Sequence, residues 1–199
     1  MKKYESCTDE ALALLYTKGD DKAFDELLAR NQQKVFAYIM TMVHDQELAN
    51  DLFQETFVKV IARLHEGKYS DTGKFLFWLI RVAHNVVMDS FRRQRGSRIV
   101  EPNDGNDLNK LRSEDLLVSN RENEFVNDQI MDDIHHLMNA LPTPQREVVY
   151  MRYFQDMSFK EIAELTGVSI NTSLGRMRYA LINMRRMAKQ HDVLLSLER

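Results

Sequence analysis

The sequence predicts an all-α protein: two small helical domains joined by an acidic flexible linker, the second containing a helix-turn-helix. Three observations predict this fold class. The 199 residues include only 7 Gly and 3 Pro, too few for a chain full of tight turns. Apolar residues recur at three- and four-residue steps, and no stretch alternates apolar and polar residues long enough for a strand. A turn-rich, acidic stretch separates the two helical regions.

Residues 1–97 are expected to form the first domain, a bundle of about four helices. A short first helix begins after Ser6 or Thr8, either of which can cap it, and ends at Gly19. A loop is expected over Gly67–Gly73. Apolar positions at helical spacing mark the other three helices, over Phe24–Val43, Leu48–Leu64 and Leu76–Val87.

Residues 98–123 are predicted to be the linker, because Pro102–Asp107 has turn and coil chemistry. The charge is uneven along the chain. Residues 1–97 hold 14 basic and 14 acidic residues, residues 98–135 hold 4 and 10, and residues 136–199 hold 9 and 6. The formal charge of −3 therefore combines a neutral, an acidic and a basic block, and it does not exclude a nucleic-acid partner.

Residues 124–199 are expected to form the second domain, and Ser158–Met184 is its most informative stretch. Ser158 and Glu161 have the spacing of a capping box, Gly167 supplies a turn, and Ser169 can cap the following helix. Two helices with a short Gly turn, the second basic on its outer face, describe a helix-turn-helix. Between Ser158 and Lys189, six basic residues oppose two acidic ones, a local excess that suits phosphate binding.

The second helix of this motif is predicted to bury one apolar stripe, formed by Ile170, Leu174, Met177, Leu181 and Met184. Ser173 stands where a buried Val is usual in such motifs. A small rotation would let Leu174 take that place, which leaves the register of the base-facing side chains open.

Several classes of function lack support in the sequence. The single Cys7 excludes an internal disulfide, and no apolar run approaches the roughly 20 residues of a membrane span, so we expect a cytoplasmic protein without membrane insertion. No catalytic constellation, phosphate-binding Gly-rich loop or metal-binding motif is present. We therefore expect no enzymatic activity, no cofactor and no metal site.

Four segments in this order resemble a bacterial RNA polymerase sigma factor of the small extracytoplasmic-function (ECF) type. They are Asp51–Phe57, Phe75–Asn85, Leu141–Val149 and Met157–Ser169. The resemblance covers nearly the whole chain. It implies that the protein binds core RNA polymerase and directs promoter-specific initiation, with the first domain reading melted −10 DNA and the second reading the −35 duplex.

The resemblance also implies roles for residues of the first domain. Docking on the clamp helices of the polymerase β′ subunit falls to Asp51, Gln54 and Glu55, although an ordinary solvated face would look the same. Contacts with −10 DNA fall to Tyr69, Lys74, Trp78, Arg81, Asn85, Arg92, Arg93 and Arg95. Asn85 can pair with a base edge, Tyr69 can stack on a base, and the cations can hold phosphates. At least two of Phe75, Phe77 and Trp78 are expected in the core, and His84 on the helix surface.

In the second domain, the helix-turn-helix matches the −35 reader of the family. Contacts with −35 DNA are expected from Lys160, Asn171, Thr172, Gly175, Arg176, Arg178 and Tyr179. Family members often carry a basic residue and Ser where Leu174 and Gly175 stand, so the preferred −35 sequence stays open. Val126–Phe154 corresponds to the part that sits on the β-subunit flap. The acidic linker either tethers the domains or threads through the polymerase.

Two other classes of function fit the same residues less well. A stand-alone helix-turn-helix regulator with an N-terminal helical sensor domain would bind promoter DNA without polymerase. A helical adaptor would not bind DNA at all. An anti-sigma factor is a common partner in the family, but no residue of this chain specifies one.

Overall fold

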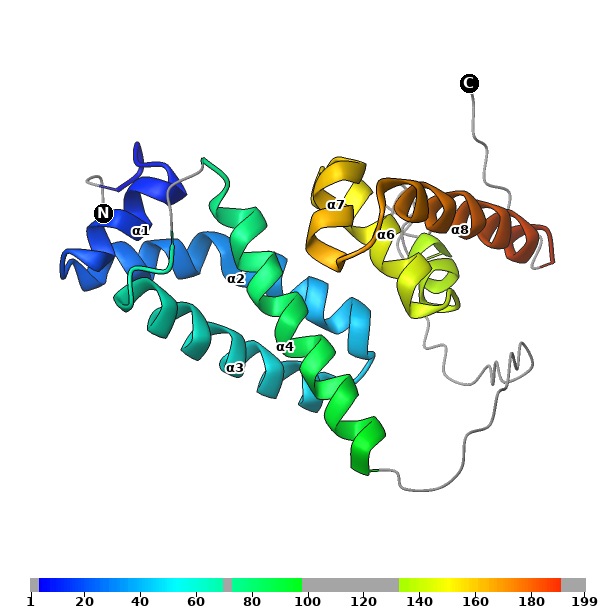
Figure 1. The fold of residues 1–199 in the computed structure, drawn as a ribbon, viewed down its shortest axis with the longest axis horizontal. Coiled ribbons are helices and arrows are strands. Elements are labelled where there is room, and N and C mark those ends of the chain that lie inside the picture. The colour runs from blue at the N-terminus through cyan, green and yellow to red at the C-terminus, as the bar shows by residue number, and fades with distance from the viewer. Residues whose placement is uncertain (1–3, 70–72, 98–132, 191–199) are drawn as a thin grey trace, which may run out of the picture. The chain divides into compact units, whose positions relative to one another are not determined.

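The computed structural model describes residues 4–69, 73–97 and 133–190, and all regular secondary structure within these ranges is helical. The chain divides into two compact units, Met1–Arg98 and Ile99–Arg199 (Figure 1). Within the described ranges, no helix is long and apolar enough to cross a membrane. The predicted linker, residues 98–123, lies outside the described residues.

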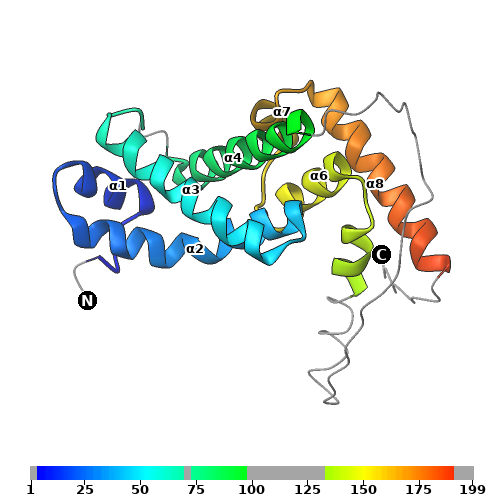
Figure 2. The same ribbon diagram turned by 90° about the horizontal axis from the view of Figure 1, so that it is seen from below.

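Unit 1 is a four-helix arrangement in which α2 packs against the other three helices (Figures 1 and 2). The helices are α1 (Asp9–Thr17), α2 (Asp21–Val43), α3 (Gln46–His65) and α4 (Phe75–Ser97). Side-chain oxygens of Thr8 and Asp45 accept backbone hydrogen bonds and so begin α1 and α3. The fully buried core includes Leu12, Val35, Tyr38, Ile39, Leu64, Leu79 and Ile80.

His84 was expected on the helix surface, and this expectation is wrong. The side chain is buried, and its Nδ1 atom lies 3.1 Å from the hydroxyl of Tyr38 on α2, within hydrogen-bonding distance. α4 buries an unusually wide face, so that the neighbouring Val82 and Ala83 are buried together with His84. A wide buried face needs partners on two sides, and α4 has them in α2 and α3.

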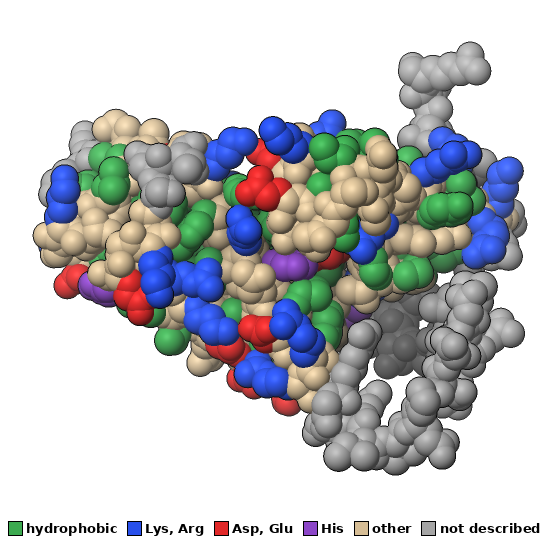
Figure 3. Space-filling model, viewed as in Figure 1, with side chains coloured by type: hydrophobic (Ala, Val, Ile, Leu, Met, Phe, Trp, Pro, Cys, Tyr) green, Lys and Arg blue, Asp and Glu red, His purple; other side chains and the backbone are tan. Residues whose placement is uncertain are grey.

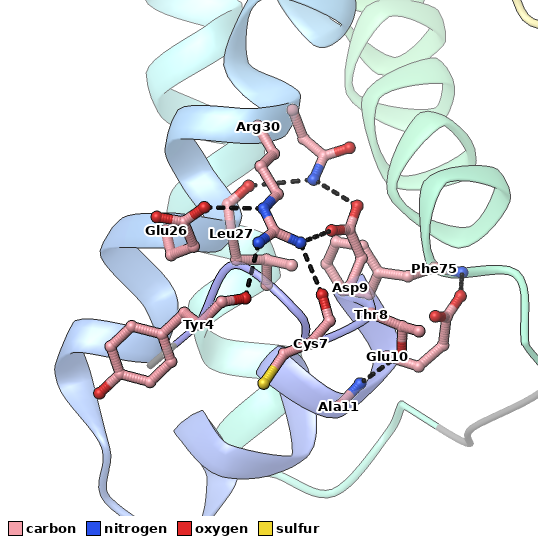
Figure 4. Close-up of polar contacts among 11 residues, drawn as sticks. Tyr4, Cys7, Thr8, Asp9, Glu10, Ala11, Glu26, Leu27, Arg30 and Phe75 are labelled. Carbon is pink, nitrogen blue, oxygen red and sulfur yellow. Dashed lines mark hydrogen bonds and ion pairs between the residues drawn. The ribbon is translucent and has the colours of Figure 1, made fainter. Parts of the chain in front are cut away.

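The N-terminal segment is fixed to α2 by Arg30 (Figure 4). Its guanidinium donates to the carbonyl oxygens of Tyr4, at 2.8 Å, and Cys7, at 2.7 Å, and it pairs with Glu26 on its own helix. From α1, the Glu10 carboxylate accepts a 3.0 Å hydrogen bond from the backbone N–H of Phe75, the first residue of α4 (Figure 4). Arg30 thus fixes the N-terminal segment to α2, and Glu10 of α1 holds the start of α4 in place.

Unit 2 contains residues 133–139, which are helical, followed by α6 (Thr143–Tyr153), α7 (Phe159–Thr166) and α8 (Ile170–Gln190). α6 and α7 both pack against α8. The buried Arg146 of α6 donates to the carbonyl oxygen of Asn139 at 2.9 Å, which places a cation at the C-terminal end of the preceding helix. Burial lowers the pKa of Arg146.

The buried stripe of α8 differs from the predicted one. Ser173 and Ala180 are fully buried and Met177 nearly so, whereas Ile170 and Leu174 are exposed. Leu174 therefore does not take the place of Ser173. On the facing helix α7, Ala163 is buried as well, so that small side chains on both helices permit a close approach. Helix α8 therefore buries a stripe of small side chains and leaves the larger apolar side chains beside it exposed, because α7 and α8 can pack closely only through small side chains.

Candidate nucleic-acid interface

One face of α4, together with the residue before it, carries four of the eight predicted −10 residues. Lys74, Trp78, Arg81 and Asn85 follow one another at steps of four, three and four, so they lie on one side of the helix. Lys74, Arg81 and Asn85 are exposed, and Trp78 is half-buried. The opposite side of α4 is buried in the core through Leu79, Ala83 and Val86 and their neighbours. α4 thus presents the amide of Asn85 one turn after the exposed cation of Arg81.

Tyr69 lies in an aromatic cluster at the start of this face. Its ring is edge-on to Phe75, at 5.5 Å between centroids, and to Trp78, at 5.1 Å. The side chain is only 8% exposed. At least two of Phe75, Phe77 and Trp78 were expected in the core, but only Phe75 is buried there, and Phe77 and Trp78 are half-buried, so this expectation is wrong. Tyr69 is therefore buried against the first residues of α4, and its contact with a base stays a prediction.

Two predicted DNA contacts near the end of α4 are held by carboxylates. Arg92 lies 3.3 Å from Asp89, one turn earlier on the same helix, and Arg93 lies 3.1 Å from Glu55 of α3. Lys59 pairs with Glu55 at 2.8 Å and is 4.0 Å from Asp89, so a network joins α3 to α4. Blue and red side chains accordingly alternate over these two helices in Figure 3. Hydrogen bonding from Lys59, followed by that from Arg93, lowers the pKa of Glu55.

The outer face of α3 carries the predicted polymerase contacts. Asp51 and Gln54 are exposed, and Glu55 is partly exposed within the network just described. Val58 lies one turn beyond Gln54 and is 65% exposed. Val58 is not among the residues that the sequence predicted to contact the polymerase. The face formed by Asp51, Gln54 and Glu55 is therefore polar, and the exposed apolar side chain of Val58 lies at its C-terminal end.

The helix-turn-helix forms through the local signals that predicted it. Ser158 and Glu161 make both hydrogen bonds of the capping box, and Gly167 ends α7 with a left-handed φ of 68°. The Ser169 hydroxyl accepts a 3.0 Å hydrogen bond from the N–H of Thr172 at the start of α8. These caps fix where α8 begins, and therefore which residues lie in its first turns.

All seven predicted −35 residues retain access to solvent. Five are exposed and two are partly exposed; the exposed ones are Lys160, Asn171, Thr172, Arg178 and Tyr179, and the others are Gly175 and Arg176. Sequence reasoning missed two exposed neighbours, Ile170 and Leu174, since both were assigned to the core. The sequence signal that could have placed them is a second stripe of small residues, Ser173 and Ala180, which lies one position away from the predicted apolar stripe of α8.

Comparisons with known proteins identify the class to which this fold and these surfaces belong. Residues 27–97 match the family model described as Sigma-70 region 2, and residues 131–174 match the model described as Sigma-70, region 4. The chain belongs to the sigma-70 family of transcription initiation factors. Within that family it is a sigma factor of the ECF type.

Curated relatives agree with this assignment. The chain is 27% identical over 174 residues to the RNA polymerase sigma-H factor of Pseudomonas aeruginosa, covering 84% of this chain and 87% of the relative. It is 26% identical over 174 residues to the ECF RNA polymerase sigma-E factor of Escherichia coli, covering 86% and 90%.

Two solved structures share the fold. CnrH in complex with the cytosolic domain of CnrY has a TM-score of 0.62 at 21% identity, covering 92% of this chain and 97% of that one. The sigma factor RpoE in complex with the anti-sigma factor NepR from Bartonella quintana has a TM-score of 0.62 at 20% identity, covering 84% and 98%. At these identities the likeness concerns the fold.

The protein is therefore a sigma factor that directs promoter-specific transcription initiation. Region 2 occupies the part of the chain that a stand-alone regulator would use as a sensor domain, so the alternative of a sensor-linked regulator is not supported. The family is one of transcription regulators.

Proposed function

We propose that the two units divide promoter recognition between them. The face formed by Lys74, Trp78, Arg81 and Asn85 binds the melted −10 strand, with Arg92 and Arg93 toward its far end. Arg95 is proposed for the same contacts, and its side chain lies outside the part that the structure describes. The outer face of the helix-turn-helix reads the −35 duplex through Lys160, Asn171, Thr172, Gly175, Arg176, Arg178 and Tyr179. Asp51, Gln54 and Glu55 dock on the β′ clamp helices, and Val126–Phe154 sits on the β flap.

The observation that carries the −10 assignment is the position of Asn85. It is exposed on a rigid helix, one turn from exposed Arg81, on the side of α4 that faces away from the core. An amide can donate to and accept from a base edge at the same time, and neighbouring cations hold the phosphates. Exposed base faces can stack on the half-buried ring of Trp78.

Opening of the promoter then needs no chemical step from the protein. A surface that binds the unpaired strand better than the duplex shifts the equilibrium toward the open state by its difference in affinity. We therefore propose a non-enzymatic protein without a cofactor or a metal. It acts in the cytoplasm, because its proposed partners, core RNA polymerase and promoter DNA, are there.

An anti-sigma factor is a further proposed partner. CnrH and RpoE, which share this fold, were each solved with a bound partner protein, CnrY and NepR. The exposed outer faces of α3 and α8 are surfaces that such a partner could cover, and covering them would block the polymerase and the promoter together.

Transcription by purified core RNA polymerase, with and without this protein, tests the proposal as a whole. We expect the protein to bind core enzyme and to redirect initiation to a distinct set of promoters. If the protein binds promoter DNA alone and core enzyme does not change the sites it occupies, the division proposed above is wrong.

Asn85→Ala tests the −10 assignment. The variant should reduce permanganate reactivity of the −10 thymines by roughly tenfold or more, while binding of the closed duplex changes little. Gln94→Ala is the matched control, because Gln94 is an exposed amide further along the same helix. Equal loss of opening in both variants, or none in Asn85→Ala, would contradict the assignment.

A further inference from the structure

Two apolar side chains stand exposed at the start of the −35-facing helix. Ser173, Met177 and Ala180 turn toward the core, and this register leaves Ile170 46% exposed and Leu174 44% exposed. The two are four residues apart, so they are neighbours on one flank over the first two turns of α8. They form a short apolar ridge, Ile170 and Leu174, that the packing of unit 2 does not use.

The position of the ridge decides what it can touch. A helix-turn-helix places the N-terminal residues of its second helix against base edges in the major groove. Asn171 and Arg178, both exposed, lie beside Leu174 on the surface of α8. Any ligand that contacts these two polar side chains in the groove must also meet the ridge.

The surrounding charge favours DNA over an apolar protein surface as the occupant. Within the described part of the chain, Arg176 and Arg178 make no ion pair, and six basic residues between Ser158 and Lys189 oppose two acidic ones. Such uncompensated cations attract a polyanion. Among base edges in the major groove, the apolar group is the 5-methyl of thymine.

Gly175 supports the same approach. A Cβ at this position would meet no atom within 4 Å, so the packing of unit 2 does not require glycine. The missing side chain instead leaves space directly beside Leu174, through which the helix backbone can come close to the groove.

We propose that Leu174, supported by Ile170, is a specificity-determining residue that contacts the 5-methyl group of a thymine in the −35 element. This inference rests on the proposed function of α8 as the −35 reader. It adds that the ridge selects thymine and that it does so through the 5-methyl group.

Substitution of deoxyuridine for each −35 thymine, one at a time, tests the proposal, because it removes the methyl group and leaves the Watson–Crick pairing unchanged. Binding of the reconstituted holoenzyme to each duplex is measured by fluorescence anisotropy. We expect one or two positions at which affinity falls about fourfold, the fold-change expected for burial of one methyl. Leu174→Ala should bind the thymine duplex more weakly and be indifferent to deoxyuridine at those positions.

Ile182→Ala is the matched control. Ile182 is 47% exposed, nearly the same as Leu174, but it lies two turns further along α8, away from the base-reading end. This variant should keep the full sensitivity to deoxyuridine. Leu174→Met, which preserves an apolar side chain and helix propensity, should retain part of it and shows that a loss in Leu174→Ala does not reflect misfolding.

The outcomes separate the inference from the function on which it rests. If scrambling the −35 element does not weaken binding of the wild-type holoenzyme, α8 is not the −35 reader. If scrambling weakens binding but the deoxyuridine series is flat, or Leu174→Ala stays as sensitive as wild type, the methyl contact is wrong. A ridge that serves a protein partner gives the flat series and also overturns the proposal.

Discussion

α4 and α8 are both long helices with basic outer faces, but their arginines are held differently. Arg92 and Arg93 of α4 pair with Asp89 and Glu55. Arg176 and Arg178 of α8 make no ion pair within the described residues. The difference matches the charge of the two regions, because residues 1–97 have as many acidic as basic residues whereas residues 136–199 have an excess of basic ones. Unit 2 is therefore better suited to capture duplex DNA unaided.

The ion pairs of Arg92 and Arg93 on α4 are weak enough to be replaced. Exposed ion pairs contribute only about 0–1 kcal/mol each, so they are easily exchanged for contacts with a phosphate. Since Glu55 also lies on the proposed polymerase-docking face, a partner that engages Glu55 would leave Arg93 available to DNA. Weak affinity of the free protein for single-stranded DNA, rising on the polymerase, is what this arrangement favours.

Arg178→Ala should produce the largest effect, because it removes an uncompensated cation from the base-reading end of α8. We expect −35 affinity to fall by roughly 10- to 100-fold, with relaxed preference at one base pair. Arg186→Ala, on the exposed C-terminal half of α8, should weaken binding only a few-fold and equally for all sequences. Competition binding with a −35 library measures both, and unchanged preference in Arg178→Ala would contradict its assignment.

Glu10→Ala should destabilise unit 1 by about 1 kcal/mol, because it removes the carboxylate that accepts from the N–H of Phe75 at the start of α4. Glu10→Gln keeps an acceptor and should lose less. Urea unfolding of the full chain, monitored by Trp78 fluorescence, measures both.

The effect should depend on pH in a defined direction. The hydrogen bond from Phe75 lowers the pKa of Glu10 below its ordinary value of 4.5, so the charged form is favoured in the folded state. The stabilisation is present above pH 4.5 and is lost as pH falls through the lower folded-state pKa. The difference between wild type and Glu10→Ala should therefore shrink at acidic pH, and a difference that grows would contradict this account.

The substitutions Gly167→Ala and Gly175→Ala form a matched pair, and we expect them to change the free energy of unfolding in opposite directions. Neither added Cβ would meet an atom within 4 Å, but Gly167 has a φ of 68°. Alanine should destabilise unit 2 by about 1 kcal/mol at Gly167 and stabilise it by up to about 1 kcal/mol at Gly175. At Gly175 we also expect weaker −35 binding, measured by anisotropy. If both variants shift the thermal unfolding midpoint in the same direction, the argument from the backbone conformation of Gly167 is contradicted.

Glu55→Gln should have the smallest effect on stability, a few tenths of a kcal/mol, because the network it breaks is partly exposed. The free chain should nevertheless bind a single-stranded −10 oligonucleotide two- to threefold more tightly, at low salt, since Arg93 is released. Glu47→Gln on the same helix is the control for the change in net charge. The same gain in both variants would show that the pairing with Arg93 is not the cause.

Much of the architecture could be predicted from the sequence because its signals are local. The helix periods, the Ser158–Glu161 capping box and the turn at Gly167 depend on neighbouring residues, and each is found in the structure. The family resemblance, carried by four short segments, is confirmed by the matches to regions 2 and 4 of sigma-70. The individual DNA and polymerase contacts remain predictions.

The sequence by itself determined that this protein is all-α, that it contains a helix-turn-helix, and which helices carry the candidate DNA contacts. Only the tertiary structure decided that Ser173 is buried and Leu174 exposed, that His84 contacts Tyr38, and that Glu55 pairs with Arg93. Apolar periodicity predicts the spacing of the residues that a helix buries. Two stripes with this spacing lie side by side on α8, and the periodicity alone does not say which of them is buried. The choice between them depends on how closely α7 can approach α8, and small side chains on both helices settle it.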